Sequence, residues 1–298
     1  MFKKVIVFAA LGVSSAADVC RALAMSGGGS KGAFEAGALY GLYHAKDAGQ
    51  DFDYDVITGV SAGAINTGAM SVFPKEDTEH MLQVISDTWS HLTTADLYVQ
   101  WNWLTREAAG IVNHSGIYNT DPLYKFITKF FSDHGGKIHR KISVAGVDVN
   151  TGSYHVWDET ASDVPKAVVS SSSIPFIFPN QHWKDEGLVI MDGGTVYNTN
   201  LVSAVERCKE VVDDESKIIL DIIVCTAHDL PKWDNTGNAM SNYLRFNEAK
   251  SYSDDMADIL EFKEAFPKVQ FRYFVEPSKP LVGALKMIDA SNSTTYPM

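Results

Sequence analysis

The fold class is decided by residues 54–71, whose sequence is YDVITGVSAGAINTGAMS. The β-rich run at 54–58 predicts a strand, and the alanine-rich segment at 62–71 predicts a helix. Between them lies Gly59-Val60-Ser61-Ala62-Gly63, which matches the pattern G-x-S-x-G. Between a strand and a helix, this pattern is typical of a nucleophile elbow, a strained turn that lifts a serine hydroxyl clear of the sheet. We therefore predict that Ser61 is a nucleophile, the alternative being a structural turn.

The same alternation of short strands and helices extends along the rest of the chain. The expected strands are residues 21–25, 54–58, 141–147, 188–191, 217–225 and 269–275, and the expected helices are 33–46, 62–71, 199–209 and 239–262. Such alternation predicts an α/β fold with a central, mostly parallel sheet and helices on both faces. No repeat or low-complexity linker divides the chain, so we expect one domain over residues 18–298. Residues 97–112 lack clear periodicity and are interpreted as an excursion from the sheet.

A glycine-rich loop follows the first expected strand and reads Ser26-Gly27-Gly28-Gly29-Ser30-Lys31-Gly32. Glycines permit a sharp turn that exposes backbone N–H groups, and the following helix N-terminus adds a positive dipole end, so the loop is suited to an anion. The spacing of its glycines also fits a dinucleotide fingerprint, with Asp47 or Asp51 near the usual position of a ribose-binding carboxylate. The loop alone therefore leaves three interpretations open: an oxyanion hole, a nucleotide site and a structural turn.

A serine nucleophile needs a neighbouring base, because its hydroxyl is weakly nucleophilic until a proton acceptor is present. The candidate base is Asp192, which directly follows the apolar strand at 188–191 and precedes two glycines. The alternative is an ordinary turn aspartate. His228 follows Asp192 in the order Ser, Asp, His used by α/β-hydrolases, so a Ser-His-Asp triad is a competing hypothesis.

The ordered set formed by the glycine-rich loop, the G-x-S-x-G motif and Asp192-Gly193-Gly194 resembles the patatin-like phospholipase family of lipid acyl hydrolases. Three further features fit the family pattern: GIYNTDPL at 116–123, SSSIPFIFP at 171–179, and Asn198. The resemblance covers roughly residues 21–225. Asn200 stands where the family often has proline, and little recognisable pattern follows Cys225.

The resemblance implies a three-layer α/β/α fold and hydrolysis of carboxylic esters in phospholipids or other acyl lipids through an acyl-serine intermediate. It further implies a Ser-Asp dyad without a catalytic histidine, metal or cofactor. The implied site consists of the dyad Ser61 and Asp192, an oxyanion hole of backbone N–H groups at Gly27, Gly28, Gly29 and Gly32, the elbow glycines Gly59 and Gly63, and the aspartate-motif glycines Gly193 and Gly194. Because the reference pKa of aspartate is about 3.9, Asp192 would need desolvation to act as a base.

The charge balance is acidic, with 37 Asp and Glu against 25 Lys and Arg and a formal net charge of −12. The absence of a Lys or Arg cluster in the sequence argues against nucleic acid as a partner. The acidic balance also disfavours charge-driven docking on anionic lipid. For an acyl-lipid substrate we expect apolar contact with a membrane or micelle surface through residues 97–104, which include Trp101 and Trp103. The alternative is that these aromatic side chains are buried.

Residues 1–17 have the order of a secretory signal peptide, with Lys3 and Lys4, an uncharged run at 5–13 and small residues at 15–17. We therefore expect secretion, with Asp18 near the mature N-terminus; the alternative is a buried first strand. Removal of two lysines would leave 23 basic against 37 acidic residues, a net charge of −14.

Three cysteines would remain after that cleavage: Cys20, Cys208 and Cys225. This odd number allows at most one internal disulfide and a free thiol, and the sequence does not identify the pair. Three buried, unpaired cysteines are the alternative.

Overall fold

A computed structural model describes residues 19–45, 52–101, 113–227, 229–230, 232–233, 239–281 and 288–290. The predicted signal peptide at 1–17 lies outside these residues. An eight-stranded sheet has the order β10-β9-β1-β2-β5-β8-β7, with β6 also paired to β5. Its strands are β1 (Cys20–Met25), β2 (Val56–Gly59), β5 (Lys141–Asp148), β6 (Tyr154–Trp157), β7 (Gln181–Trp183), β8 (Leu188–Asp192), β9 (Ile218–Ile223) and β10 (Gln270–Val275).

The sheet is mixed but mostly parallel. The neighbours from β10 through β9, β1 and β2 to β5 pair in parallel. The strands β6, β7 and β8 add an antiparallel edge. The predicted mostly parallel sheet is therefore confirmed, whereas β6, β7 and the reversed direction of β8 were not predicted. A separate two-stranded sheet joins β3 (Val99–Gln100) to β4 (Tyr118–Asn119), so the start of the expected excursion does lie off the main sheet.

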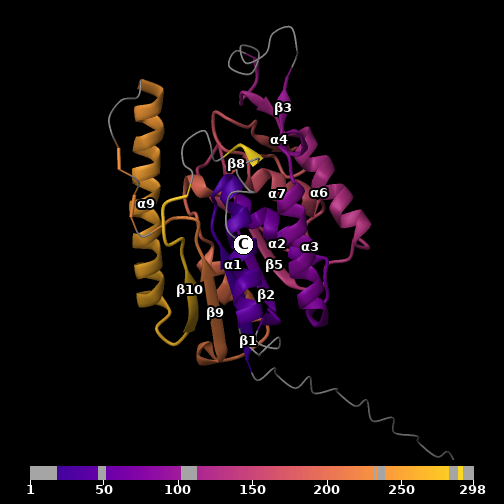
Figure 1. Ribbon diagram of the computed structural model, residues 1–298, viewed down its shortest axis with the longest axis vertical. Helices are drawn as coiled ribbons and strands as arrows, with labels where there is room; N and C mark the ends of the chain where they lie inside the picture. The colour runs from indigo at the N-terminus through magenta and orange to yellow at the C-terminus, as the bar shows by residue number, and fades with distance from the viewer. Residues whose placement is uncertain are drawn as a thin grey trace, which may run out of the picture.

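Helices cover both faces of the sheet (Figure 1). They are α1 (Gly32–Ala45), α2 (Ala62–Ser71), α3 (Thr78–His91), α4 (Thr94–Leu97), α6 (Asp121–Asp133), α7 (Val164–Ser171), α8 (Leu201–Cys208) and α9 (Ala239–Ala265). Side chains of β1 alternate between the faces, as the pleat of a strand requires. Leu23 and Met25 belong to the core that contains α1, α2, α3, α6 and α7, whereas Ala22 and Ala24 belong to the core that contains α8 and α9. The three-layer α/β/α fold is thus confirmed.

A buried ion pair fixes the β9–β10 edge. The Arg272 side chain donates to both carboxylate oxygens of Asp221, through Nε to Oδ1 at 3.0 Å and through Nη2 to Oδ2 at 2.5 Å. The Tyr54 hydroxyl donates to the same Oδ2 at 2.7 Å. Because an unpaired buried carboxylate is strongly destabilising, this pairing ties β9 and β10 to the segment that leads into β2.

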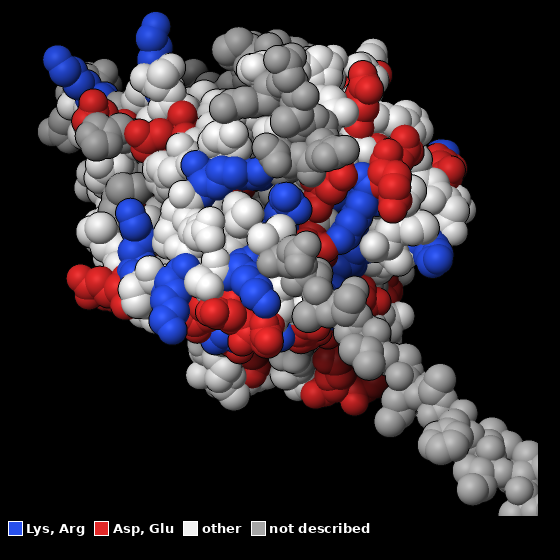
Figure 2. Space-filling model, turned by 90° about the horizontal axis from the view of Figure 1, so that it is seen from below, with Lys and Arg blue, Asp and Glu red and all other residues white. Residues whose placement is uncertain are grey.

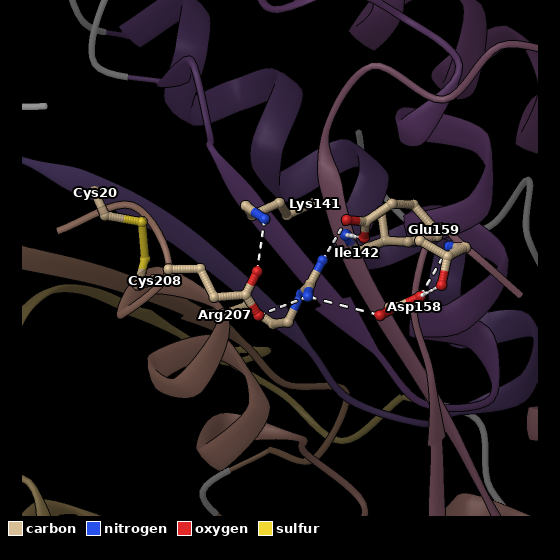
Figure 3. Close-up of polar contacts among 9 residues, drawn as sticks. Cys20, Lys141, Ile142, Asp158, Glu159, Arg207 and Cys208 are labelled. Carbon is tan, nitrogen blue, oxygen red and sulfur yellow. Dashed lines mark hydrogen bonds and ion pairs between the residues drawn. A yellow bond between two sulfur atoms is a disulfide. The ribbon is translucent and has the colours of Figure 1, made fainter. Parts of the chain in front are cut away.

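The disulfide joins Cys20, at the start of β1, to Cys208, at the end of α8, and leaves Cys225 as a buried free thiol. Next to the disulfide, Arg207 pairs with Glu159, with Asp158 at 3.6 Å and with Glu210 (Figure 3). These groups lie near the N-terminal ends of the parallel strands.

Seen from below, the molecule shows acidic and basic side chains interspersed (Figure 2), so this face carries no single-sign basic patch.

The disulfide should make a large contribution to stability, because it links residues 188 positions apart in the sequence. We expect Cys20→Ala/Cys208→Ala to lower the free energy of unfolding by about 2–4 kcal/mol, measured by urea denaturation. Wild-type protein unfolded in the presence of a thiol reductant should reach the same midpoint as the variant. A variant midpoint equal to that of the oxidised wild type would contradict the expectation.

Candidate active site

Ser61 lies in a tight turn between β2 and α2 and has φ 52° and ψ −114°. This left-handed backbone conformation is strained for a residue other than glycine, at a cost of order 1–3 kcal/mol. The turn is packed directly onto the end of β1, because Gly63 donates its N–H to the Ser26 carbonyl at 3.1 Å. A Cβ at Gly63 would collide with the Met25 and Ser26 carbonyls, and one at Gly59 with the Gly63 carbonyl. The glycines predicted for an elbow therefore stand where only glycine fits.

Three consecutive serines at the C-terminal end of α7, Ser171, Ser172 and Ser173, connect Ser61 to Asp192. Ser171 Oγ accepts from the Ser61 N–H at 3.0 Å, and Ser172 Oγ donates to the Ser61 carbonyl at 3.0 Å. The Asp192 N–H donates to the Ser173 carbonyl at 2.9 Å. This run was quoted from the sequence only as part of a family pattern. In the folded chain it fixes the backbones of both predicted catalytic residues from one side.

Asp192 ends β8 and is 5 % exposed. Its Oδ1 accepts from the Gly194 N–H at 2.7 Å, whereas Oδ2 has no hydrogen-bond partner in the described part of the chain. Burial raises the pKa of Asp192 to about 7, against the smaller lowering effects of the Gly194 N–H and the nearby Ser61 hydroxyl. A carboxylate with this pKa is a far better proton acceptor near neutral pH than a solvated aspartate.

The glycine-rich loop lies beside Ser61, and its N–H groups are not equivalent. Gly27 donates to the Asn198 carbonyl at 3.1 Å, and Gly32 donates to the carbonyls of Gly29 and Ser30. Their N–H groups are therefore not available to an oxyanion, which corrects the expectation for Gly27 and Gly32. The N–H groups of Gly28 and Gly29 make no hydrogen bond among the described residues. Gly29 has φ 61°, a conformation that favours glycine.

A Cβ on Gly27 would come within 3.1 Å of the Ser61 Cβ, so this loop and the serine share one small space. That proximity favours the oxyanion-hole interpretation over a dinucleotide site. Asp47 and Asp51, the candidate ribose-binding residues, lie outside the described residues.

An apolar pocket opens at Ser61 and Gly29. Its walls include six apolar side chains: Ile65, Trp89, Leu97, Leu123, Ile174 and Phe178. This apolar lining would suit a hydrocarbon chain attached to a group at Ser61.

A second buried carboxylate supports the loop from α1 and was not predicted. Glu35 is fully buried, and its Oε2 accepts from the Asn66 side chain at 2.9 Å. Asn66 also donates to the Gly32 carbonyl and accepts from the Trp89 indole. Burial raises the pKa of Glu35 well above its usual range, because removal from water disfavours the charged form. A single glutamate within an otherwise apolar helix start was the only sequence signal for it.

Several other predicted features lie outside this cluster. His228, Trp103 and Leu104 are outside the described residues. Trp101 is partly buried, donates from Nε1 to the Gly116 carbonyl at 2.9 Å and stacks on His114. Across the described ranges, no group of three His, Cys, Asp or Glu residues could hold a metal ion. No helix described in the structure is both long enough and apolar enough to cross a bilayer.

Comparisons with solved structures return proteins of low sequence identity. VipD from Legionella pneumophila is 10 % identical, with a TM-score of 0.42 over 94 % of this chain and 66 % of that one. ExoU in its complex with SpcU, from Pseudomonas aeruginosa, is 13 % identical, with a TM-score of 0.33 over 82 % of this chain and 52 % of that one. This chain thus spans slightly less than two thirds of the first protein and about half of the second.

A search of curated proteins with the sequence gives no match. The family model described as patatin-like phospholipase matches residues 23–205. That range is more than half of the 298 residues and contains the glycine-rich loop, Ser61 and Asp192. The chain therefore belongs to the patatin-like phospholipase family.

Proposed function

We propose that this protein is a lipid acyl hydrolase in which Ser61 is the nucleophile and Asp192 is the general base. The observation that carries the proposal is that a strained serine lines an apolar pocket and lies beside a desolvated carboxylate. Membership of the patatin-like phospholipase family supports an acyl-lipid substrate.

In the proposed first step, the Ser61 hydroxyl attacks the ester carbonyl while its proton passes to Oδ2 of Asp192, the oxygen without a hydrogen-bond partner among the described residues. The N–H groups of Gly28 and Gly29 would stabilise the negative charge that develops on the carbonyl oxygen. Collapse of the tetrahedral intermediate breaks the ester C–O bond, and Asp192 returns the proton to the departing alcohol or lysophospholipid. The acyl group is then bound to Ser61, with its chain in the apolar pocket.

In the second step, Asp192 removes a proton from a water molecule, which attacks the acyl-enzyme. The fatty acid leaves and the Ser61 hydroxyl is restored. Transfer of the acyl group to an alcohol acceptor would use the same intermediate, with the alcohol in the place of water.

Export to an oxidising compartment is part of the proposal. The disulfide between Cys20 and Cys208 supports it, because disulfides persist mainly in extracellular and secretory environments. The predicted signal peptide at residues 1–17 agrees with that location.

A Ser-His-Asp triad that uses His228 is the second candidate mechanism. The raised pKa of Asp192 favours the dyad, since a carboxylate that only orients a histidine does not need to be basic itself. Nucleotide binding by the glycine-rich loop is disfavoured by the closeness of Gly27 to Ser61.

Removing either member of the dyad should abolish turnover. We expect Ser61→Ala and Asp192→Asn each to reduce kcat for a soluble carboxylic ester by on the order of a thousandfold or more. Ser132→Ala, on the exposed face of α6, is the matched control and should retain full activity. His228→Ala should also remain active, and a collapse of its kcat together with retained folding would favour the triad. Covalent labelling by a serine-directed phosphonate should disappear only in Ser61→Ala.

Activity should depend on the ionisation of Asp192. Because burial raises the pKa of Asp192 to about 7, the carboxylate is protonated and inactive as a base at lower pH. We expect kcat/KM for a neutral ester to rise about tenfold between pH 6 and pH 7 and to level off above pH 7. The profile should be measured at constant ionic strength. A plateau extending down to pH 5 would show that the base has an ordinary aspartate pKa and would contradict the assignment.

The rim of the pocket is proposed to contact lipid surfaces by apolar side chains. Val99 is 43 % exposed and Phe176 is 47 % exposed. The two belong to one rim, since β3 pairs with β4 and Tyr118 of β4 donates to the Ile177 carbonyl. The formal net charge of −12 makes attraction to anionic lipid unfavourable, so neutral and zwitterionic surfaces are the expected partners.

We expect Val99→Ser/Phe176→Asn to weaken cosedimentation with phosphatidylcholine vesicles severalfold, with unchanged kcat on a soluble ester. Val202→Ser, an equally exposed valine on α8, is the matched control. Adding anionic lipid at low salt should not strengthen wild-type binding. Unchanged binding of the double variant would exclude this rim as the contact surface.

A further inference from the structure

Asn198 lies between the two backbone segments of the proposed site. Its carbonyl accepts from the Gly27 N–H at 3.1 Å, and its Nδ2 donates to the Gly27 carbonyl at 3.4 Å. A Cβ on Gly27 or on Gly194 would collide with Asn198 Oδ1. Asn198 therefore touches both the start of the glycine-rich loop and the turn whose Gly194 N–H binds the Asp192 carboxylate. A shift of this side chain would move one segment relative to the other.

The Asn198 side chain is held by a residue of α9. Asp255 Oδ2 accepts from Asn198 Nδ2 at 3.3 Å and from the Thr226 hydroxyl at 3.0 Å. Thr226 follows Cys225, whose N–H donates to Ser26 Oγ at the start of the glycine-rich loop. Asp255 Oδ2 thus binds two residues, Asn198 and Thr226, that each connect to the glycine-rich loop. Figure 1 shows α9 as a long helix at one side of the molecule, and it lies beyond residue 205, where the match to the family model ends.

Asp255 differs from its neighbours on α9 in being buried, with 4 % of its surface exposed. Asp254, the preceding residue, pairs with Lys250 in solvent. No Lys or Arg pairs with Asp255 in the residues that the structure describes, and the donors that face it from other elements are Asn198 and Thr226. The acidic groups near it, Asp254 and Asp258, are on its own helix. A buried carboxylate without a cationic partner is costly, so its hydrogen bonds to these two donors are the interactions that stabilise it here.

We propose that Asp255 is a positioning residue for the proposed hydrolysis: through Asn198 and Thr226 it fixes the glycine-rich loop against the Asp192 turn. This proposal rests on the proposed function. It makes α9, outside the family-matched part of the chain, a component of the active site. Without the Asp255 carboxylate, the Gly28 and Gly29 N–H groups would no longer be held in a fixed position relative to Ser61. This loss of alignment should weaken binding of the transition state more than binding of the substrate.

Asp255→Ala should reduce kcat on a soluble ester by roughly ten- to a hundredfold and leave KM nearly unchanged, as expected when a charge-assisted hydrogen bond that aligns donors is lost. Asp255→Asn keeps an oxygen that can accept from both donors and should retain more activity than the alanine variant. Asp254→Asn, the same substitution one position earlier, is the control and should match the wild type. All rates are expressed per serine titrated by a phosphonate at completion, so that misfolded protein is not counted.

The pH profile provides a readout that a purely structural role would not move. Burial raises the pKa of Asp255 to about 6, so this carboxylate loses its charge as the pH falls through that value. In the wild type, log kcat/KM should fall with slope one below pH 7 and steepen towards two below pH 6. Asp255→Asn should keep slope one throughout.

Wild-type kcat per titrated serine in Asp255→Ala would overturn the proposal. So would a loss confined to the fraction of titratable serine, or an unchanged steepening below pH 6 in Asp255→Asn. If Asp255→Ala fails to fold, the Asp255→Asn profile decides the question. Ser61→Ala separates the two hypotheses: an active Ser61→Ala refutes the proposed function itself, whereas an inactive one with a fully active Asp255→Ala refutes only the role of Asp255.

Discussion

The contact on which the site depends is the packing of the 59–63 turn against the carboxyl end of β1. The Gly63 N–H binds the Ser26 carbonyl, and no side-chain atom at Gly63 would fit beside Met25. This close packing holds the glycine-rich loop and the turn that contains Ser61 at a fixed separation. The strained φ of Ser61 persists because the packing of the surrounding backbone fixes the conformation of the turn. The N–H groups of Gly28 and Gly29, which make no hydrogen bond within the described part of the chain, therefore lie close to Ser61.

The site and the main stabilising contacts lie at opposite ends of the sheet. The disulfide and the Arg207 ion pairs are near the N-terminal ends of the parallel strands. In contrast, Ser61 follows the carboxyl end of β2, and Asp192 of the antiparallel strand β8 lies opposite Gly146, near the carboxyl end of β5. This separation allows the catalytic end to contain groups that destabilise the fold, such as a buried carboxylate with an oxygen lacking a hydrogen bond. Ligand sites at the carboxyl ends of strands are the general rule for open α/β sheets.

Much of this fold could be predicted from the sequence, because its central elements have strong local signals. The helix expected at 62–71 has those bounds in the structure, and the strand expected at 21–25 differs by one residue. The helices α3, α6 and α7 were not predicted, although α6 has boundary signals in Pro122 of its first turn and in Gly135 and Gly136 after its end. The antiparallel direction of β8 was missed because pairing direction depends on non-local contacts. The cysteine pairing was undetermined for the same reason.

The candidate site, too, could be predicted from the sequence only in part, because its non-local contacts have no sequence signal. Ser61, Asp192 and the glycine-rich loop could be found because each is part of a short motif, but motifs do not reveal which N–H groups are already bonded. Only the folded chain shows that Gly27 and Gly32 donate elsewhere. Asp255 had no motif at all: in sequence it is one acidic residue among several on α9.

Three buried carboxyl groups with raised pKa values belong to the candidate site or to its supports in this acidic chain. Glu35, Asp192 and Asp255 are each under a tenth exposed, and burial raises the pKa of all three. Asp221 is equally buried, but the Arg272 guanidinium pairs with it. Asp148 is 5 % exposed and has only neutral donors, but its pKa is lowered, chiefly by the hydrogen bond from Thr151. A buried carboxylate without a cationic partner therefore has a raised pKa only where the effect of desolvation exceeds that of its hydrogen bonds. Glu35, Asp192 and Asp255 lie around the glycine-rich loop, where a change of protonation can affect the proposed chemistry.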